Sequence, residues 1–342
     1  ILADVYNTSV DSIVAANPWV DPQSLQIGQI VTVPLGFEVV PTNISYTSML
    51  MGFLVEGLRA RYPFLETGSI GYSVLGRPIY YIAIGNGETE VSYNASHHAN
   101  EWITTPLLMK FIEEYAEAYI INGTIFNMSA SALYNRAKLY VIPMVNTDGV
   151  DLVTGGIPPG SAAYERARAL AQSYPAIPFP SGWKANIAGV DLNLQYPAGW
   201  ERAREQKFAQ GFTRPGPRDY VGTGPLTEPE SIAMYNFTRA HNFALTISYH
   251  TQGQVIYWRF LEYLPPNSLE IARRFSMVSG YPYEETPEYS GYAGYKDWFI
   301  QTYNRPGYTI EAGLGESPLP LSQFDEIYSD NIGILVLGID LA

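Results

Sequence analysis

His98 and Glu101 are the first pair of residues in the chain whose types and spacing suit metal chemistry. A neutral imidazole and a carboxylate are both ligands of Zn²⁺, and three residues apart they can face one point. The pair follows a strand-like segment at 90–94 and precedes a segment, 103–121, whose apolar residues recur at helical spacing. We therefore expect the pair at the carboxyl end of a strand, where open α/β sheets bind ligands.

A His-x-x-Glu pair alone is common on ordinary protein surfaces, so a zinc site needs a third ligand. The histidines of the chain stand at positions 97, 98, 241 and 250. His241 ends the amphipathic segment 228–242, where a histidine commonly faces the helix C-terminus, and we interpret it as structural. His250 follows the apolar segment 243–249, so it also lies at the exit of a strand. Three protein ligands would leave one tetrahedral position open, which is typical of a catalytic zinc.

Composition limits the classes of protein to which the chain can belong. Its 342 residues, 46% hydrophobic and 15% charged, suit one large core with a small satellite domain. The absence of cysteine excludes disulfides, thiolate catalysis and cysteine zinc sites. A net charge of −13 argues against nucleic acid as a partner. No run of about 18 apolar residues predicts a membrane span, and we interpret Ile1 as the start of a processed or trimmed chain.

Six blocks of sequence, in order, resemble the zinc carboxypeptidases of the carboxypeptidase A type over residues 46–342. They are His98-x-x-Glu101-Trp102; Val145-Asn146-Thr147-Asp148-Gly149-Val150; Trp183-Lys184 with Gly189-Val190-Asp191-Leu192-Asn193; Ser248-Tyr249-His250; Tyr289 with Asp297-Trp298; and Tyr308-Thr309-Ile310-Glu311. The resemblance implies an α/β fold with a mixed sheet and helices on both faces. It also implies one Zn²⁺ per catalytic domain, held by His98, Glu101 and His250.

Two catalytic roles are implied by the resemblance. Glu311 matches the general base that takes a proton from water and delivers it to the departing nitrogen. Tyr289, eight residues before Asp297, matches a mobile tyrosine that closes on the substrate. Four other tyrosines lie between positions 281 and 295, so a neighbouring tyrosine or a simply packed loop is the alternative. His97 is then a wall residue beside the metal site.

The chain departs from the family pattern at three substrate-binding positions. Lys184 stands where an arginine polarises the scissile carbonyl; it keeps the charge but loses the planar fork. Leu194, directly after the substrate-binding residue Asn193, replaces the arginine that clamps a terminal carboxylate. Asn100, also expected to bind substrate, stands where another arginine is frequent. A general carboxypeptidase is therefore a poor match.

Lys296 lies where the family sets its preference for the side chain beyond the cut. A cation there favours an acidic group on the leaving side, and meso-diaminopimelate carries a second carboxylate on its side chain. The alternative is a lysine that merely begins a helix before Asp297.

The segment before the catalytic domain is similar to a LysM module. Residues 4–18 predict two short helices, and 25–34 predict a turn and a strand. The closing pattern, Asn17-Pro18 and then Leu25-x-x-Gly28-Gln29 with Val33-Pro34, resembles the β-α-α-β module that binds N-acetylglucosamine glycans, with its first strand missing. We expect this module over 1–35, a linker over 36–45, and the catalytic domain over 46–342. A helical cap on the enzyme is the alternative.

Within the catalytic domain, helix-like spacing opens the chain at 46–62. The stretch 154–187, with five prolines, predicts a loop-rich surface wall near the site.

A wall-binding module joined to a zinc peptidase without the usual clamp resembles the bacterial γ-D-glutamyl-diamino acid endopeptidases. Those enzymes cut the peptidoglycan stem peptide between D-glutamate and the diamino residue. The resemblance implies the stem peptide and its glycan as partners, and an extracellular, wall-associated or spore-related location. Three alternatives stay open: a conventional metallocarboxypeptidase using Lys184, Lys296 or Arg218 as its clamp, a deacylase of small amides, and a non-catalytic wall-binding protein.

Overall fold

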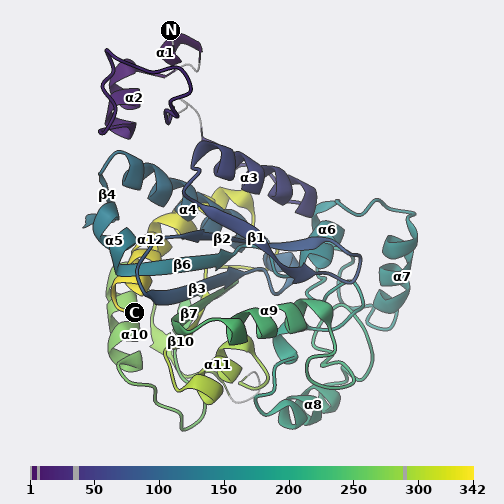
Figure 1. Cartoon of the computed structure of the whole chain (residues 1–342). Helices are drawn as coiled ribbons and strands as arrows, with labels where there is room; N and C mark the ends of the chain where they lie inside the picture. The colour runs from purple at the N-terminus through teal and green to yellow at the C-terminus, as the bar shows by residue number, and fades with distance from the viewer. Residues whose placement is uncertain (1, 6–7, 34–37, 288–290) are drawn as a thin grey trace.

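The computed structural model describes residues 2–5, 8–33, 38–287 and 291–342, and an eight-stranded mixed sheet lies at its centre (Figure 1). The strand order is β1-β2-β6-β3-β7-β10-β8-β9. The strands are β1 (Glu66–Tyr72), β2 (Pro78–Ile84), β3 (Thr89–Ala95), β6 (Ala137–Ile142), β7 (Phe243–His250), β8 (Val255–Tyr257), β9 (Tyr283–Glu284) and β10 (Gly307–Glu311). The neighbours β6, β3, β7 and β10 run parallel, and antiparallel β2 and β8 flank them. A small hairpin, β4 (Thr124–Ile125) and β5 (Met128–Ser129), stands apart.

Helices cover both faces of this sheet, as expected. On one face the main core packs under α3 (Ser48–Arg61), α4 (Thr104–Ile120), α5 (Ala130–Arg136), α10 (Ser268–Ser279) and α12 (Phe324–Asp340). On the other face lie α9 (Pro229–Ala240) and α11 (Tyr295–Tyr303). Side chains alternate between these cores because successive residues of a strand point to opposite faces. Val91 and Tyr93 belong to the first core, whereas Ile79 and Ile142 belong to the second.

The alternating segments of the sequence form the elements that they predicted. The strand-like segments 90–94 and 243–249 are β3 and β7, and the helical segments 46–62, 103–121 and 228–242 are α3, α4 and α9. None of the described helices has the length and hydropathy needed to cross a membrane.

The prediction of a loop-rich wall over 154–187 is wrong in part, because helix α7 (Ala162–Ala171) lies within it. Only Ala167 and Ala171 of this helix are buried, so its inner face gives little apolar periodicity in the sequence. The Ser161 side chain caps it by accepting a hydrogen bond from the Tyr164 backbone N–H. The preceding α6 (Thr147–Thr154) and the following α8 (Trp200–Ala209) lie on the same side of the molecule (Figure 1).

At the N-terminal end, α1 (Leu2–Val5) and α2 (Val10–Ala16) form the two predicted short helices. The strand predicted before Pro34 is wrong for the described residues up to 33, which carry no ladder. A strand forms hydrogen bonds with the backbone of a neighbouring strand. At Thr32 a side chain forms these bonds instead. The buried Asn17 amide donates to the Thr32 carbonyl (2.7 Å) and accepts from the Thr32 N–H (2.8 Å). The described residues up to 33 therefore carry two short helices and no strand.

Candidate metal centre

Three adjacent parallel strands bring the candidate catalytic residues to one edge of the sheet. Ala95 at the end of β3 pairs with Tyr249 of β7, and His250 pairs with Glu311 at the end of β10. His98 follows β3 by three residues. The residues predicted at strand exits therefore meet because their strands are neighbours, in the place where parallel sheets bind ligands.

Side-chain and backbone hydrogen bonds fix the turn that carries His98. Ser96 adopts a left-handed conformation, φ 53°, which costs roughly 1 kcal/mol for a residue with a Cβ. The Asn146 amide donates to the His97 carbonyl (3.1 Å), and the Ala99 N–H donates to the Lys184 carbonyl (3.0 Å). The short 3-10 helix η1 (Ala99–Glu101) then turns Glu101 back toward His98. This loop is held rigidly against the segment that carries Lys184.

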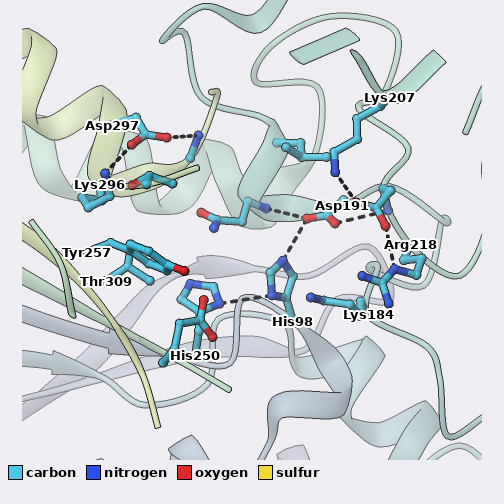
Figure 2. A pocket seen from close by; sticks show the side chains of 16 residues that line it. His98, Lys184, Asp191, Lys207, Arg218, His250, Tyr257, Lys296, Asp297 and Thr309 are labelled. Carbon is cyan, nitrogen blue, oxygen red and sulfur yellow. Dashed lines mark hydrogen bonds and ion pairs between the residues drawn. The ribbon is translucent and has the colours of Figure 1, made fainter. Parts of the chain in front are cut away.

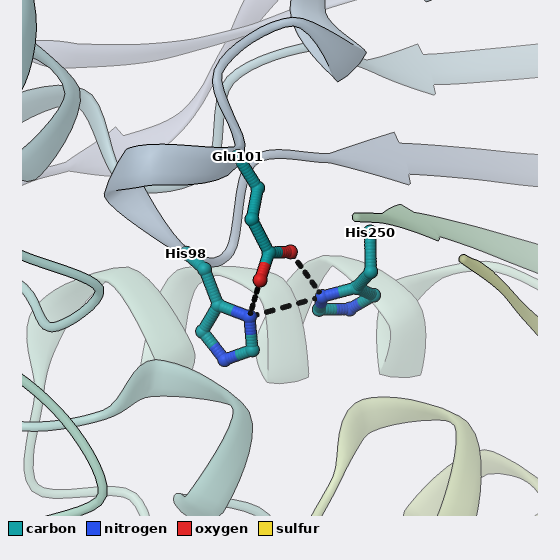
Figure 3. A group of neighbouring side chains, drawn as sticks. All are labelled: His98, Glu101 and His250. Atoms are coloured by element: carbon teal, nitrogen blue, oxygen red, sulfur yellow. Dashed lines mark hydrogen bonds and ion pairs between the residues drawn. The ribbon is translucent and has the colours of Figure 1, made fainter. Parts of the chain in front are cut away.

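His98, Glu101 and His250 converge on one point (Figure 3). His98 Nδ1 lies 2.9 Å from Glu101 Oε1 and 3.1 Å from His250 Nδ1, and His250 Nδ1 lies 2.9 Å from Glu101 Oε2. A tetrahedral zinc with bonds of roughly 2.0–2.1 Å separates its ligand atoms by about 3.3 Å, so these separations suit it. All three side chains are buried. Two imidazole nitrogens and a carboxylate are a donor set that Zn²⁺ takes with a position left open.

Asp191 orients the first histidine from outside the metal triad. Its Oδ1 lies 3.1 Å from His98 Nε2, the ring nitrogen that faces away from the convergence point. A carboxylate behind a metal-binding imidazole fixes the ring and its tautomer. Burial lowers the pKa of His98, but the Glu101 and Asp191 carboxylates outweigh it and raise that pKa to about 9. At neutral pH the metal-free ring is therefore a cation, with a proton on each of its two nitrogens.

We expect Asp191→Asn to weaken zinc binding by about 10- to 100-fold, because the amide no longer carries the charge that orients and polarises His98. Competition against a zinc-binding dye measures the change. Asp325→Asn, which changes an exposed carboxylate on α12, is the matched control. Equal zinc affinity in Asp191→Asn and the wild type would contradict this role.

Glu311 lines the same cavity as His98 and His250. Burial and then the Glu101 carboxylate raise the pKa of Glu311 from an ordinary 4.5 to about 8. A carboxyl group so tuned can both accept and return a proton near neutral pH, which suits a general acid–base residue.

The raised pKa of Glu311 should also make the stability of the metal-free protein depend on pH. Because the folded pKa of Glu311 lies above its unfolded value, its contribution to stability is complete below about pH 4.5 and is lost as the pH rises through 8. Glu311→Gln removes that loss. Relative to the wild type, the chelated variant should gain on the order of 3 kcal/mol more unfolding free energy at pH 8 than at pH 5. Denaturant unfolding at both values measures it, and a pH-independent difference would refute the assignment.

The cavity at the triad, of about 240 Å³, extends to both sides of the metal-binding residues. Figure 2 shows Lys296 and Asp297 at one end, Lys207 and Arg218 at the other, and the two histidines between them. Lys296 is buried, and its ammonium donates to the Arg259 carbonyl (2.8 Å) and to Asp297 Oδ1 (2.5 Å). We call this space the metal cavity.

Most of the predicted substrate-binding residues line the metal cavity. Lys184, Asn193 and Lys296 do so, and Lys184 Nζ lies 3.0 Å from Glu101 Oε1. Burial lowers the pKa of Lys184, but Glu101 outweighs it and raises that pKa, so the ammonium stays charged. Asn100 lines instead a neighbouring cavity, together with Glu101. Tyr289 lies outside the described residues, and its role stays a prediction.

The other two histidines contribute no atom to the metal triad. His97 is buried beside the triad and its Nε2 lies 3.0 Å from the Tyr196 hydroxyl. His241 caps α9 and its Nδ1 lies 2.9 Å from Glu90 Oε1, which confirms the structural interpretation.

Sequence reasoning missed the charged network behind His98. Asp219 accepts hydrogen bonds from Lys207 Nζ (2.6 Å) and from Arg218 Nε (2.6 Å), and its N–H donates to Asp191 Oδ2 (3.2 Å). Asp191 belongs to one of the six sequence blocks that resemble the zinc carboxypeptidases, two residues before Asn193, but its position in the sequence does not indicate a role. Nothing in the local sequence marks Lys207 or Asp219, because a residue of helix α8 meets a loop residue that follows it by 12 positions.

Comparison with known proteins agrees with this geometry. A family model described as zinc carboxypeptidase matches residues 53–332. The chain is 48% identical over 299 residues to gamma-D-glutamyl-L-diamino acid endopeptidase 1 of Lysinibacillus sphaericus, covering 87% of this chain and 73% of that one. It is 42% identical over 276 residues to the uncharacterized protein YqgT of Bacillus subtilis strain 168, covering 80% and 72%.

The fold also matches that of a solved structure. Bovine thrombin-activatable fibrinolysis inhibitor, solved with a tick carboxypeptidase inhibitor, superposes with a TM-score of 0.68 at 19% identity, over 88% of this chain and 98% of that one. The family match covers most of the chain and includes the triad, the Asp191 contact and Glu311. The chain therefore belongs to the zinc carboxypeptidase family.

Proposed function

We propose that this protein is a zinc-dependent peptidoglycan hydrolase that cleaves the bond between γ-D-glutamate and the diamino residue of bacterial stem peptides. The observation that carries the proposal is a metal triad in a cavity that Glu311 and Leu194 also line. By the family resemblance, Glu311 is the acid–base residue and Leu194 takes the place of the carboxylate clamp. The relative from Lysinibacillus sphaericus, whose name states this activity, supports the choice of bond.

Different residues of the site have different roles in amide hydrolysis. His98, Glu101 and His250 would hold the zinc, which supplies Lewis acidity toward the carbonyl and makes water more acidic. Glu311 removes the proton of the attacking water and gives it to the leaving nitrogen. The Lys184 ammonium stabilises the negative charge that develops on the carbonyl oxygen.

The leaving side of the substrate meets a paired charge rather than a lone cation. Lys296 is hydrogen-bonded to Asp297 at one end of the metal cavity, so this end offers one ammonium and one carboxylate. The end of the meso-diaminopimelate side chain is itself an amino acid, with one ammonium and one carboxylate. The Lys296 ammonium and the Asp297 carboxylate together complement such a group better than they complement a simple acidic side chain.

The N-terminal residues 1–35 belong to the proposal as a glycan-binding module, and with them a location at the cell wall. The sequence pattern around Asn17 and Gly28 supports this module. Sedimentation with purified peptidoglycan tests it: the chain should co-sediment, and a chain shortened to residues 46–342 should do so several-fold less. Equal sedimentation of both chains would contradict a binding role for the module.

The activity is tested with L-Ala-γ-D-Glu-meso-diaminopimelate and with an ordinary dipeptide that ends in a hydrophobic residue, each with and without a zinc chelator. We expect chelator-sensitive release of diaminopimelate from the first substrate and no turnover of the second. Turnover of the dipeptide alone would mean that the protein is a conventional carboxypeptidase with a cation elsewhere as its clamp.

A further inference from the structure

A second cavity, of about 340 Å³ and lined in part by Glu101, adjoins the metal cavity. Among its lining residues are Asn100, Thr251 and Ser317, and it shares Lys184 and Arg218 with the metal cavity. A substrate that crosses the triad from the Lys296 end would continue past Lys184 and Arg218. The shared wall is thus where the acyl side of the cleaved bond would lie.

Arg218 is the cation on this wall with the most hydrogen-bonding capacity left. Its Nε donates to Asp219 Oδ2 (2.6 Å), and no described residue accepts a hydrogen bond from its two terminal nitrogens. Its side chain is 42% exposed. Lys207, in contrast, is 11% exposed and bonded to Asp219, and the Lys184 ammonium is bonded to Glu101. Asp219 therefore holds the guanidinium by one edge and leaves the other edge directed away from it.

Because Asn100 is neutral, it supplies no positive charge to this wall beside Arg218. It stands where an arginine is frequent in the family, and it brings a neutral amide to the second cavity. Its Oδ1 is buried with no hydrogen-bond donor among the described residues. Asn100 can accept a peptide N–H, but it cannot neutralise an anion.

The proposed substrate carries an anion at this location. A γ-linked glutamyl residue forms its peptide bond through the side-chain carboxyl group, so its α-carboxylate stays free on the acyl side of that bond. A guanidinium with two free nitrogens on one edge matches a carboxylate through two parallel hydrogen bonds.

We propose that Arg218 is a specificity residue that binds the free α-carboxylate of the γ-linked glutamate. This inference rests on the proposed function, and it adds that the protein distinguishes a γ-linked glutamate from its α-amidated form, isoglutamine, through one arginine.

Two substrates that differ in that one group test the inference: L-Ala-γ-D-Glu-meso-diaminopimelate and its α-amidated form. The wild type should prefer the carboxylate in kcat/KM by about 10- to 100-fold, the range for a charge-assisted hydrogen bond. Arg218→Gln should bring this ratio close to one, mainly through the carboxylate substrate. Arg218→Lys should keep part of the preference. Arg168→Gln, an exposed arginine on α7 outside both cavities, should keep all of it.

Zinc content of each variant separates recognition from a structural role, because Arg218 also contacts Asp219 behind the metal site. If Arg218→Gln loses zinc and both activities equally, Arg218 positions the network and the inference is wrong. A wild type that cleaves both substrates equally also overturns it, while leaving the proposed function intact. A wild type that cleaves neither substrate overturns the proposed function itself.

Discussion

Replacing Glu311 by glutamine should lower kcat by about 10²- to 10⁴-fold while zinc stays bound, the range that general acid–base catalysis contributes. Glutamine keeps the size of the side chain but cannot take a proton from water. Glu311 contributes no atom to the triad of His98, Glu101 and His250, so the metal donors remain in place. The loss should fall on kcat more than on KM, because the interaction is made in the transition state.

Steady-state kinetics and zinc analysis of the same preparation measure both parts of this result. Glu326→Gln, an exposed change on α12, is the matched control and should resemble the wild type. A Glu311→Gln protein with full zinc and nearly full kcat would remove Glu311 from the mechanism.

Removing the metal, by a chelator or by His250→Ala, should lower activity on the order of 10³-fold or more, since the Lewis acid supplies several kcal/mol to the transition state. Zinc added back should restore the chelated protein but not the variant. His241→Gln should keep zinc and activity, because His241 lies at the end of α9 beside Glu90.

Zinc binding to the apo-protein should also release protons at pH 7. Burial lowers the pKa of His98, but Glu101 and Asp191 outweigh it and raise that pKa to about 9. The cationic ring must lose one of its two protons to become a ligand. Zinc affinity should therefore fall as the pH falls below 9. Calorimetry in two buffers with different ionisation enthalpies counts the protons released. Identical apparent enthalpies in both buffers would show that the apo-site already holds neutral histidine.

The sequence predicts the metal centre well because its signals are local. His98 and Glu101 are three residues apart, and His250 and Glu311 each end an apolar strand. Parallel neighbours then bring these strand ends together without further information. The resemblance to a known family supplies the roles, and the fold follows from the alternation of strands and helices.

Local signals fail where residues act through contacts between segments that are not adjacent in the sequence. Asp219 reaches Lys207 and Asp191 across stretches of 12 and 28 residues, and no spacing rule connects them. Helix α7 escapes the pattern because alanines form its buried face. The strand expected before Pro34 fails for the opposite reason: its residues suit a strand, but a side chain, Asn17, meets the backbone of Thr32 in place of a neighbouring strand.

Mass spectrometry of a single digest identifies the bond that the protein cuts. The zinc-loaded protein is incubated with L-Ala-γ-D-Glu-meso-diaminopimelyl-D-Ala, and the products are identified by mass. We predict L-Ala-D-Glu and diaminopimelyl-D-Ala, from cleavage at the γ-glutamyl bond. Release of D-alanine alone, which leaves the γ-glutamyl bond intact, would contradict the account and make the protein a carboxypeptidase.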